Sequence, residues 1–124
     1  MENEELLMRT QRFSLRIMNL VENLPTNKSF TVISGQILRS ATSVGANYRA
    51  ARRAKSGRDF VNKLKIVEEE ADETLYWLEL IQKSGHVPAT KMDDIVNEAN
   101  ALVAIFVTSI RTAKLNGTGR KVRS

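Results

Sequence analysis

A run of carboxylates in the middle of the chain holds the residue types best suited to chemistry. Its members are Glu68, Glu69, Glu70, Asp72 and Glu73. In helical bundles, Glu residues combine with Glu-x-x-His pairs to build di-metal centres in the core. The chain has a single histidine, His86, which lies beside Gly85 in a predicted loop. The ligand set is therefore incomplete, and we expect no metal and no other cofactor.

Nucleophilic catalysis has equally little support. The chain has no cysteine, and a single histidine leaves most serine or threonine nucleophiles without a base. No nucleophile elbow, phosphate-binding glycine loop or Asp-His-Ser set can be assembled from the sequence. We therefore expect a protein that is not an enzyme and has no small-molecule substrate.

A polar ridge is formed by three residues spaced four apart, Arg39, Ser43 and Asn47, and it is predicted to face the acidic run. A hairpin that turns near Ser56 places Arg39 opposite Glu73, and places Ser43 one turn further along. Charged groups paired between helices more often fix the register than perform chemistry. We therefore predict a structural clamp in preference to a ligand site, formed by Arg39, Ser43, Asn47, Glu69, Glu70 and Glu73.

The densest group of cations follows the polar ridge. Its members are Arg49, Arg52, Arg53, Lys55 and Arg58. No acid occurs between positions 23 and 58. Such a cluster can contact nucleic-acid phosphates, and the adjacent Tyr48 offers a ring on which one base could stack. The alternative is a solvated face that the acidic segment of a neighbouring chain neutralises.

The composition is that of an ordinary folded domain. A chain of 124 residues, 42% of them hydrophobic and 27% charged, can bury one core without metals or disulfides. The net charge of +5 favours polyanionic partners. The lack of cysteine fits a reducing cytosol, and neither a signal peptide nor an apolar run of ~18 residues is found. We expect a cytoplasmic protein that does not span a membrane.

Helices must position these side chains. Pro25, Pro88 and the turn at residues 55–57 separate periodic segments, the first two of which cover about residues 3–23 and 29–54. In the third segment, apolar residues alternate at spacings of four and three from Phe60 to Ile81, which is typical of a bundle seam.

The ends of the later segments carry capping signals. Ser56 with Asp59 predicts the start of the third segment, and Gly85 predicts its end. Thr90 with Asp93 predicts the start of the fourth, which fades near position 116. Because the loops are short, neighbouring helices should be antiparallel. We predict an all-α, antiparallel up-and-down four-helix bundle over residues 1–116 and a flexible basic tail at 117–124.

The third segment has more apolar surface than one seam requires. Ile66, Trp77 and Leu80 form a second stripe beside the main one. Either the fourth helix of the same chain covers both stripes, or the second stripe is a subunit interface. Because Trp is a common interface anchor, we predict a homo-oligomer interface at these three residues.

The second segment also carries a recognisable motif. Residues 39–47 read Arg-Ser-Ala-Thr-Ser-Val-Gly-Ala-Asn. This run resembles the motif Arg-Ala-Ala-x-Ser-Ile-Pro-Ala-Asn-Ile-Ala-Glu-Gly of a bacterial four-helix-bundle family that is encoded in intervening sequences of 23S ribosomal RNA genes and is sometimes labelled a ribosomal protein. The matching positions are Arg39, Ser43, Ala46 and Asn47. Gly45 replaces the proline and residues 50–51 replace the Glu-Gly, so any role of that Glu is not carried over.

The resemblance implies an up-and-down bundle that assembles into a ring, a homopentamer, with no established enzymatic activity. A related accessory protein of diversity-generating retroelements is also a pentameric bundle and binds nucleic acid through a basic surface. The expected partners are therefore further copies of the chain and RNA or DNA. The alternative is a protein-interaction scaffold that has no nucleic-acid role.

Overall fold

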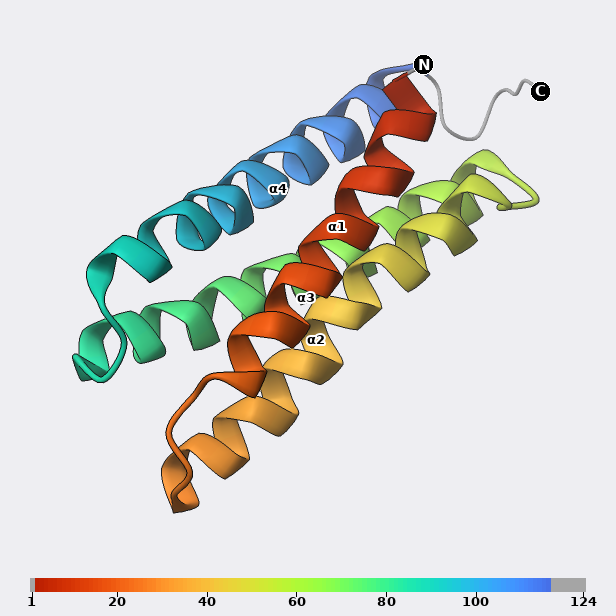
Figure 1. Ribbon diagram of the computed structural model, residues 1–124. Helices are drawn as coiled ribbons and strands as arrows, with labels where there is room; N and C mark the ends of the chain where they lie inside the picture. The colour runs from red at the N-terminus through yellow and green to blue at the C-terminus, as the bar shows by residue number, and fades with distance from the viewer. Residues whose placement is uncertain (1, 117–124) are drawn as a thin grey trace.

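Four helices make up the computed structural model, which describes residues 2–116, with side chains from residue 5 onward. They are α1 (Glu2–Glu22), α2 (Lys28–Arg52), α3 (Gly57–Ser84) and α4 (Ala89–Leu115). Successive helices run antiparallel, and α2–α3 and α3–α4 are the most extensive pairs (Figure 1). Residues 2–116 contain no strand. The predicted all-α four-helix bundle is confirmed, and the tail predicted at 117–124 lies outside the described residues.

Capping residues define the start of α2 and both ends of α3. The Asn27 side chain accepts a hydrogen bond from the backbone N–H of Phe30 at 2.9 Å and starts α2. The Ser56 hydroxyl accepts the N–H of Asp59 at 3.0 Å and starts α3, as predicted. Gly85 ends α3 with φ +75°, in the left-handed region that glycine adopts most readily.

The start of α4 differs from the prediction. The helix begins at Ala89, and Pro88 occupies the capping position without a side-chain hydrogen bond. The cap expected from Thr90 and Asp93 was wrong, because proline suits a helix start and lacks the N–H that would need a partner. Asp93 instead accepts a hydrogen bond from Gln82 of α3 at 3.3 Å.

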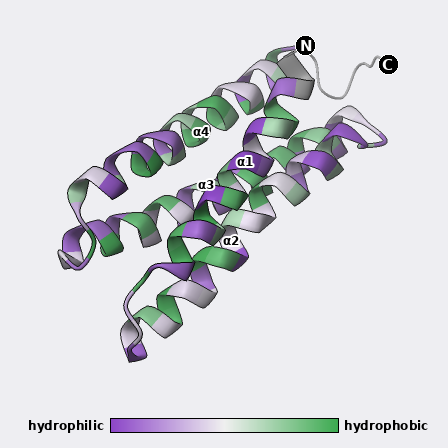
Figure 2. Ribbon diagram, in the orientation of Figure 1, coloured by the Kyte–Doolittle hydropathy of each residue, from purple (hydrophilic) through white to green (hydrophobic). Residues whose placement is uncertain are grey.

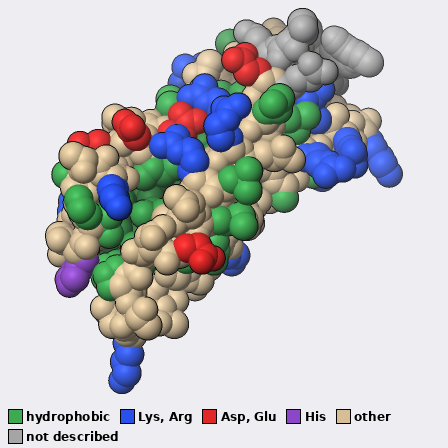
Figure 3. Space-filling model, viewed as in Figure 1, with side chains coloured by type: hydrophobic (Ala, Val, Ile, Leu, Met, Phe, Trp, Pro, Cys, Tyr) green, Lys and Arg blue, Asp and Glu red, His purple; other side chains and the backbone are tan. Residues whose placement is uncertain are grey.

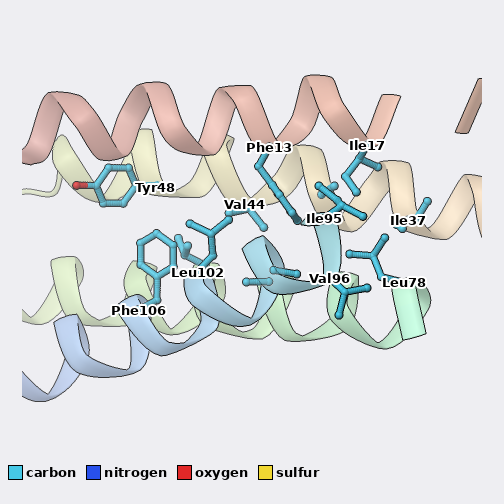
Figure 4. Close-up of a cluster of buried hydrophobic side chains, with 14 of the residues drawn as sticks. Phe13, Ile17, Ile37, Val44, Tyr48, Leu78, Ile95, Val96, Leu102 and Phe106 are labelled. Atoms are coloured by element: carbon cyan, nitrogen blue, oxygen red, sulfur yellow. The ribbon is translucent and has the colours of Figure 1, made fainter. Parts of the chain in front are cut away.

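The core lies along the inward faces of all four helices. Green and purple segments recur in turn along each helix in Figure 2, as expected of amphipathic helices. In Figure 4, Tyr48 and Val44 of α2 lie beside Phe106 and Leu102 of α4 at one end of the core, whereas Leu78 of α3 lies near Val96 at the other end. These side chains are almost fully buried. None of the described helices combines the length and hydropathy needed to cross a membrane.

The edge between α1 and α4 is the least closed side of the bundle. The two helices make few backbone contacts, and they diverge toward the C-terminal end of α1 (Figure 1). A bidentate ion pair joins them, because the Arg9 guanidinium donates to both carboxylate oxygens of Glu98 at 2.8 and 2.9 Å. On the diverging side of this pair lies an open groove of about 480 Å³.

Two glycine substitutions should change stability in opposite directions. Gly35 is exposed inside α2, and a Cβ added there meets nothing within 4 Å, so Gly35→Ala should stabilise the fold by roughly 0.5–1 kcal/mol. Gly85→Ala should destabilise it by about 1 kcal/mol, because φ is +75° there. Urea unfolding followed by circular dichroism measures both. A lower midpoint for Gly35→Ala than for wild type would contradict the helix assignment.

Candidate functional site

The polar contact between α2 and α3 is built around Arg39. Its guanidinium donates to Glu70 Oε1 at 3.1 Å and also to Glu73 Oε2. Trp77, one turn beyond Glu73, donates its indole N–H to the same carboxylate oxygen at 3.1 Å. Glu73 therefore receives two donors from two helices, and its position is fixed between them.

A pair of hydroxyls continues this contact into the core. Ser40 and Thr74 are both fully buried, and their oxygens lie 2.8 Å apart. Each hydroxyl also lies within reach of a carbonyl of its own helix, Ile37 at 3.3 Å for Ser40 and Glu70 at 2.8 Å for Thr74. Buried polar groups are costly unless they are paired, so this contact favours a single register of α2 on α3.

The clamp lowers the pKa of the Glu73 carboxyl below its ordinary value. The main cause is the hydrogen bond from Arg39, and the Trp77 N–H adds to it. The same carboxylates raise the pKa of the Arg39 guanidinium. Because the Arg39 side chain is 47% exposed, water screens the pair, and its contribution is to register more than to stability.

The other predicted clamp residues, Ser43, Asn47 and Glu69, are not part of this contact. Asn47 donates to the backbone carbonyl of Ser43 at 2.9 Å, within its own helix. Ser43 is half-buried, whereas Glu69 is exposed on the outer face of α3. The ion pairs thus join Arg39 to Glu70 and Glu73.

The acidic run does not converge on a common point. Among the side chains that the structure describes, no three potential metal ligands gather closely enough to hold an ion. Burial raises the pKa of the Glu68 carboxyl, and the like charges of Asp72 and Glu69 add to the effect. The sole histidine, His86, is an exposed loop residue whose ring packs edge-on against Phe30 at 5.6 Å between centroids.

The predicted basic cluster occupies one end of the bundle. Arg49 and Arg52 lie in the last turn of α2, Arg53 caps it, and the remaining two residues flank the start of α3. All five side chains are exposed, and blue side chains gather at this end in Figure 3. The members of this basic end are Arg49, Arg52, Arg53, Lys55 and Arg58.

The acid nearest in sequence to the basic end is already engaged. The Asp59 carboxylate accepts from Lys63 at 3.0 Å and from the backbone N–H of Lys55 at 3.3 Å. These two bonds lower the pKa of the Asp59 carboxyl, the Lys63 bond more than the other. The Asp59 carboxylate is therefore bonded to Lys63 and to the turn that joins α2 to α3.

Tyr48 does not offer a base-stacking surface, and that expectation was wrong. Its ring is 6% exposed and packs against Phe106 with centroids 5.5 Å apart. Burial raises the pKa of its hydroxyl, an effect that the charge of Arg52 opposes. Tyr48 lies on the inward face of α2, where apolar contacts outweigh its nearness in sequence to the arginines.

The second apolar stripe of α3 is divided between core and surface. Ile66 and Leu80 are 41% and 36% exposed. Trp77 is half-buried against the core, with its indole N–H bonded to Glu73. Tyr76, 53% exposed, extends the outer face instead, with its ring 5.0 Å from that of Trp77.

Comparison with known proteins places the chain in a family. A family model described as 23S rRNA-intervening sequence protein matches residues 2–108. The chain belongs to this family. It is 37% identical to a crystallised protein of unknown function from the S23 ribosomal protein family of Bacteroides thetaiotaomicron VPI-5482, with a TM-score of 0.81 over 90% of this chain and 99% of that one. A search of curated proteins found no match.

In this member of the 23S rRNA-intervening sequence protein family, the motif of residues 39–47 faces two helices. Arg39 contacts α3, whereas Gly45 lies against Thr10 of α1, where an added Cβ would lie 3.4 Å from the threonine hydroxyl. Thr10 is fully buried and donates to the carbonyl of Leu7 at 3.0 Å. The motif therefore positions α2 between its two neighbours.

Glu73→Gln should lower the free energy of unfolding at neutral pH and have less effect at acidic pH. Because the pKa of Glu73 is lowered in the folded state, its ionised carboxylate stabilises the fold above the ordinary pKa of 4.5. This contribution is lost as the pH falls through the lowered pKa. Wild type should therefore unfold at higher urea than Glu73→Gln at pH 7, and the difference should shrink below about pH 4.5.

The matched control is Asp94→Asn, at an acid that is exposed on α4 and outside the contact with Arg39. It should unfold at the wild-type urea midpoint at each pH. Equal midpoints for wild type and Glu73→Gln at pH 7 would show that the clamp contributes no net stability.

Proposed function

We propose that the protein is a non-catalytic homo-oligomer that binds nucleic acid through the basic end of its bundle. The observation that carries the proposal is the gathering of five exposed cations, without an acid between positions 49 and 58, where α2 ends and α3 begins. Lys and Arg side chains that neutralise phosphates release counterions, and this release supplies most of the affinity of sequence-independent binding.

The end of α4 adds to the same positive field. Arg111 and Lys114 are exposed in the last two turns of α4, which runs antiparallel to α3 and so ends beside the start of α3. Cations from two parts of the chain therefore share one end of the molecule. A surface of this size fits the phosphates of a folded or double-stranded nucleic acid better than a single small anion.

RNA is the first nucleic acid to test. The family names that match this chain refer to 23S rRNA and to a ribosomal protein. Because Tyr48 is buried, no aromatic ring of the cluster is free to stack on an unpaired base. We therefore propose that the protein contacts the phosphates of the nucleic acid and that its affinity depends little on the base sequence. The proposed setting is the cytoplasm, since a chain without cysteine gains nothing from an oxidising compartment.

Apolar side chains on the outside of the bundle support the oligomeric part of the proposal. Ile66, Tyr76 and Leu80 lie on the outer face of α3, and Met8 and Leu15 are about 60% exposed on α1, at 59% and 61%. Contiguous exposed apolar residues mark interaction surfaces. The family resemblance makes the ring, a homopentamer, the assembly that we propose. The same faces support the alternative of a scaffold for other proteins without a nucleic-acid role.

Reversing charges at the basic end should weaken binding to RNA and reduce its salt dependence. A plot of log affinity against log salt has a negative slope. Arg53→Glu/Arg58→Glu should make this slope shallower by about 2, because about one phosphate contact is lost per residue. Fluorescence anisotropy with a labelled RNA and the matching DNA, between about 50 and 200 mM salt, measures this.

The matched control is Lys28→Glu/Lys83→Glu at the opposite end of the bundle. Both variants change the net charge equally, and both reverse one cation near a helix start and one near a helix end. The control should keep the wild-type slope. Undetectable wild-type binding at low salt, or equal losses in the two variants, would contradict the proposed surface and favour the scaffold.

A further inference from the structure

The outward face of α1 carries an apolar ridge that the bundle leaves uncovered. Met8, Leu15 and Met18 are 59%, 61% and 46% exposed. Spacings of seven and three residues place them on one side of the helix, away from the buried Phe13 and Ile17. Methionine and leucine offer neither a planar ring nor a hydrogen-bond donor, so this ridge suits a protein surface better than a base or a phosphate.

The groove between α1 and α4 lies directly beside this ridge. Leu15 forms one wall, Leu20 and Ile95 contribute apolar surface, and the volume is about 480 Å³. Three cations rim it, namely Arg12, Arg16 and Lys91, and no acid lines it among the side chains that the structure describes. Figure 3 shows green side chains in the hollow of this face and blue ones beside it, with red side chains further out along α4. The groove therefore fits an occupant with apolar residues flanked by acids.

The outer face of α3 on the same molecule has that chemistry. Its apolar members are Ile66, Tyr76 and Leu80, and Glu69 and Asp72 are exposed between them. Lys65 and Lys83 lie at the two ends of this face. From Ile66 to Leu80 a helix rises about 21 Å, and from Arg12 to Asn23, along the groove, it rises about 17 Å. The two faces are comparable in length and opposite in charge at their centres.

These faces cannot meet within one chain. α1 and α3 each pack against α2 and make no backbone contact with each other in the described part of the bundle, so they lie diagonally across it. Their outward faces therefore lie on different sides of the molecule. A contact between them joins two copies by different surfaces. The first copy then retains a free α3 face and the second a free groove, with which the assembly can continue.

We infer that the α1–α4 groove of one copy binds the outer face of α3 of a second copy. This inference rests on the oligomeric part of the proposed function and specifies the pair of surfaces that forms the interface. Leu15 packs among Ile66, Tyr76 and Leu80 of the neighbour, while Arg12 and Arg16 pair with Glu69 and Asp72. Such charge pairing fixes the orientation and register of the contact.

Charge exchange between the two faces tests the inference. Arg12→Glu/Arg16→Glu and Glu69→Arg/Asp72→Arg should each assemble at least tenfold more weakly than wild type, as measured by light scattering after size exclusion. Mixing the two variants should restore association between unlike copies, because each then offers the charge that the other lacks. The two variants can only alternate, and a ring of five cannot close by alternation, so the mixture should form dimers and larger assemblies of even number or open chains. The variant that carries all four changes should assemble with itself and not with wild type.

A matched control and a second measurement separate the possible failures. Arg111→Glu/Lys114→Glu makes the same charge change on the exposed end of α4 and should assemble as wild type does, and circular dichroism checks that every variant is folded. A monomeric wild type would overturn the oligomeric proposal and this interface together. An oligomeric wild type whose variants assemble normally would overturn the interface alone. Loss of RNA binding with unchanged assembly in Arg12→Glu/Arg16→Glu would make the groove a nucleic-acid surface and also overturn it.

Discussion

The register between α2 and α3 is the constraint on which the other features depend. Arg39 joins Glu70 and Glu73 at the surface, and the hydroxyl contact of Ser40 with Thr74 lies beneath them in the core. A shift by one residue along either helix would separate both contacts and leave two buried hydroxyls without each other. Because α3 also packs along α4, the same register positions the third pair of helices.

This register also determines where the charges of the molecule lie. With α2 and α3 aligned through their middles, the α2–α3 turn falls at one end of the bundle and carries its cations into solvent. The acids of α3 lie along the length of the helix, some facing Arg39 and others on the outer face. Positive charge is thus concentrated at an end, whereas negative charge is spread along a side, and the two suit different partners.

Features carried by local periodicity could be predicted from the sequence. The unbroken spacing from Phe60 to Ile81 defines α3, and simple hairpin arithmetic about Ser56 brings Arg39 to Glu73. The two ends of α3 were also predictable, because Ser56 offers a capping hydroxyl and Gly85 a glycine stop. The start of α4 was not, because Pro88 begins a helix without any side-chain hydrogen bond.

Features that depend on contacts between residues far apart in the chain could not be predicted from the sequence. The Arg9–Glu98 pair spans 89 positions and has no periodic signal of its own. Tyr48 has the same spacing from Val44 as a core residue, yet its neighbouring arginines suggested a surface role. Trp77 was placed in the second stripe of α3, but the bond from its indole N–H to Glu73 was not foreseen. The apolar ridge of α1, at Met8, Leu15 and Met18, could have been found by its own period of three and seven.

The open edge of the bundle has a consequence for the order in which the fold comes apart. α1 packs along α2, whereas it makes few backbone contacts with α4, to which the Arg9–Glu98 pair joins it. By contrast, α3 packs extensively against both α2 and α4. Local unfolding proceeds through units with the fewest shared contacts, and here that unit is α1. The hairpins of α2, α3 and α4 therefore form the cooperative nucleus of stability, and α1 is the first segment whose backbone amides open to solvent exchange.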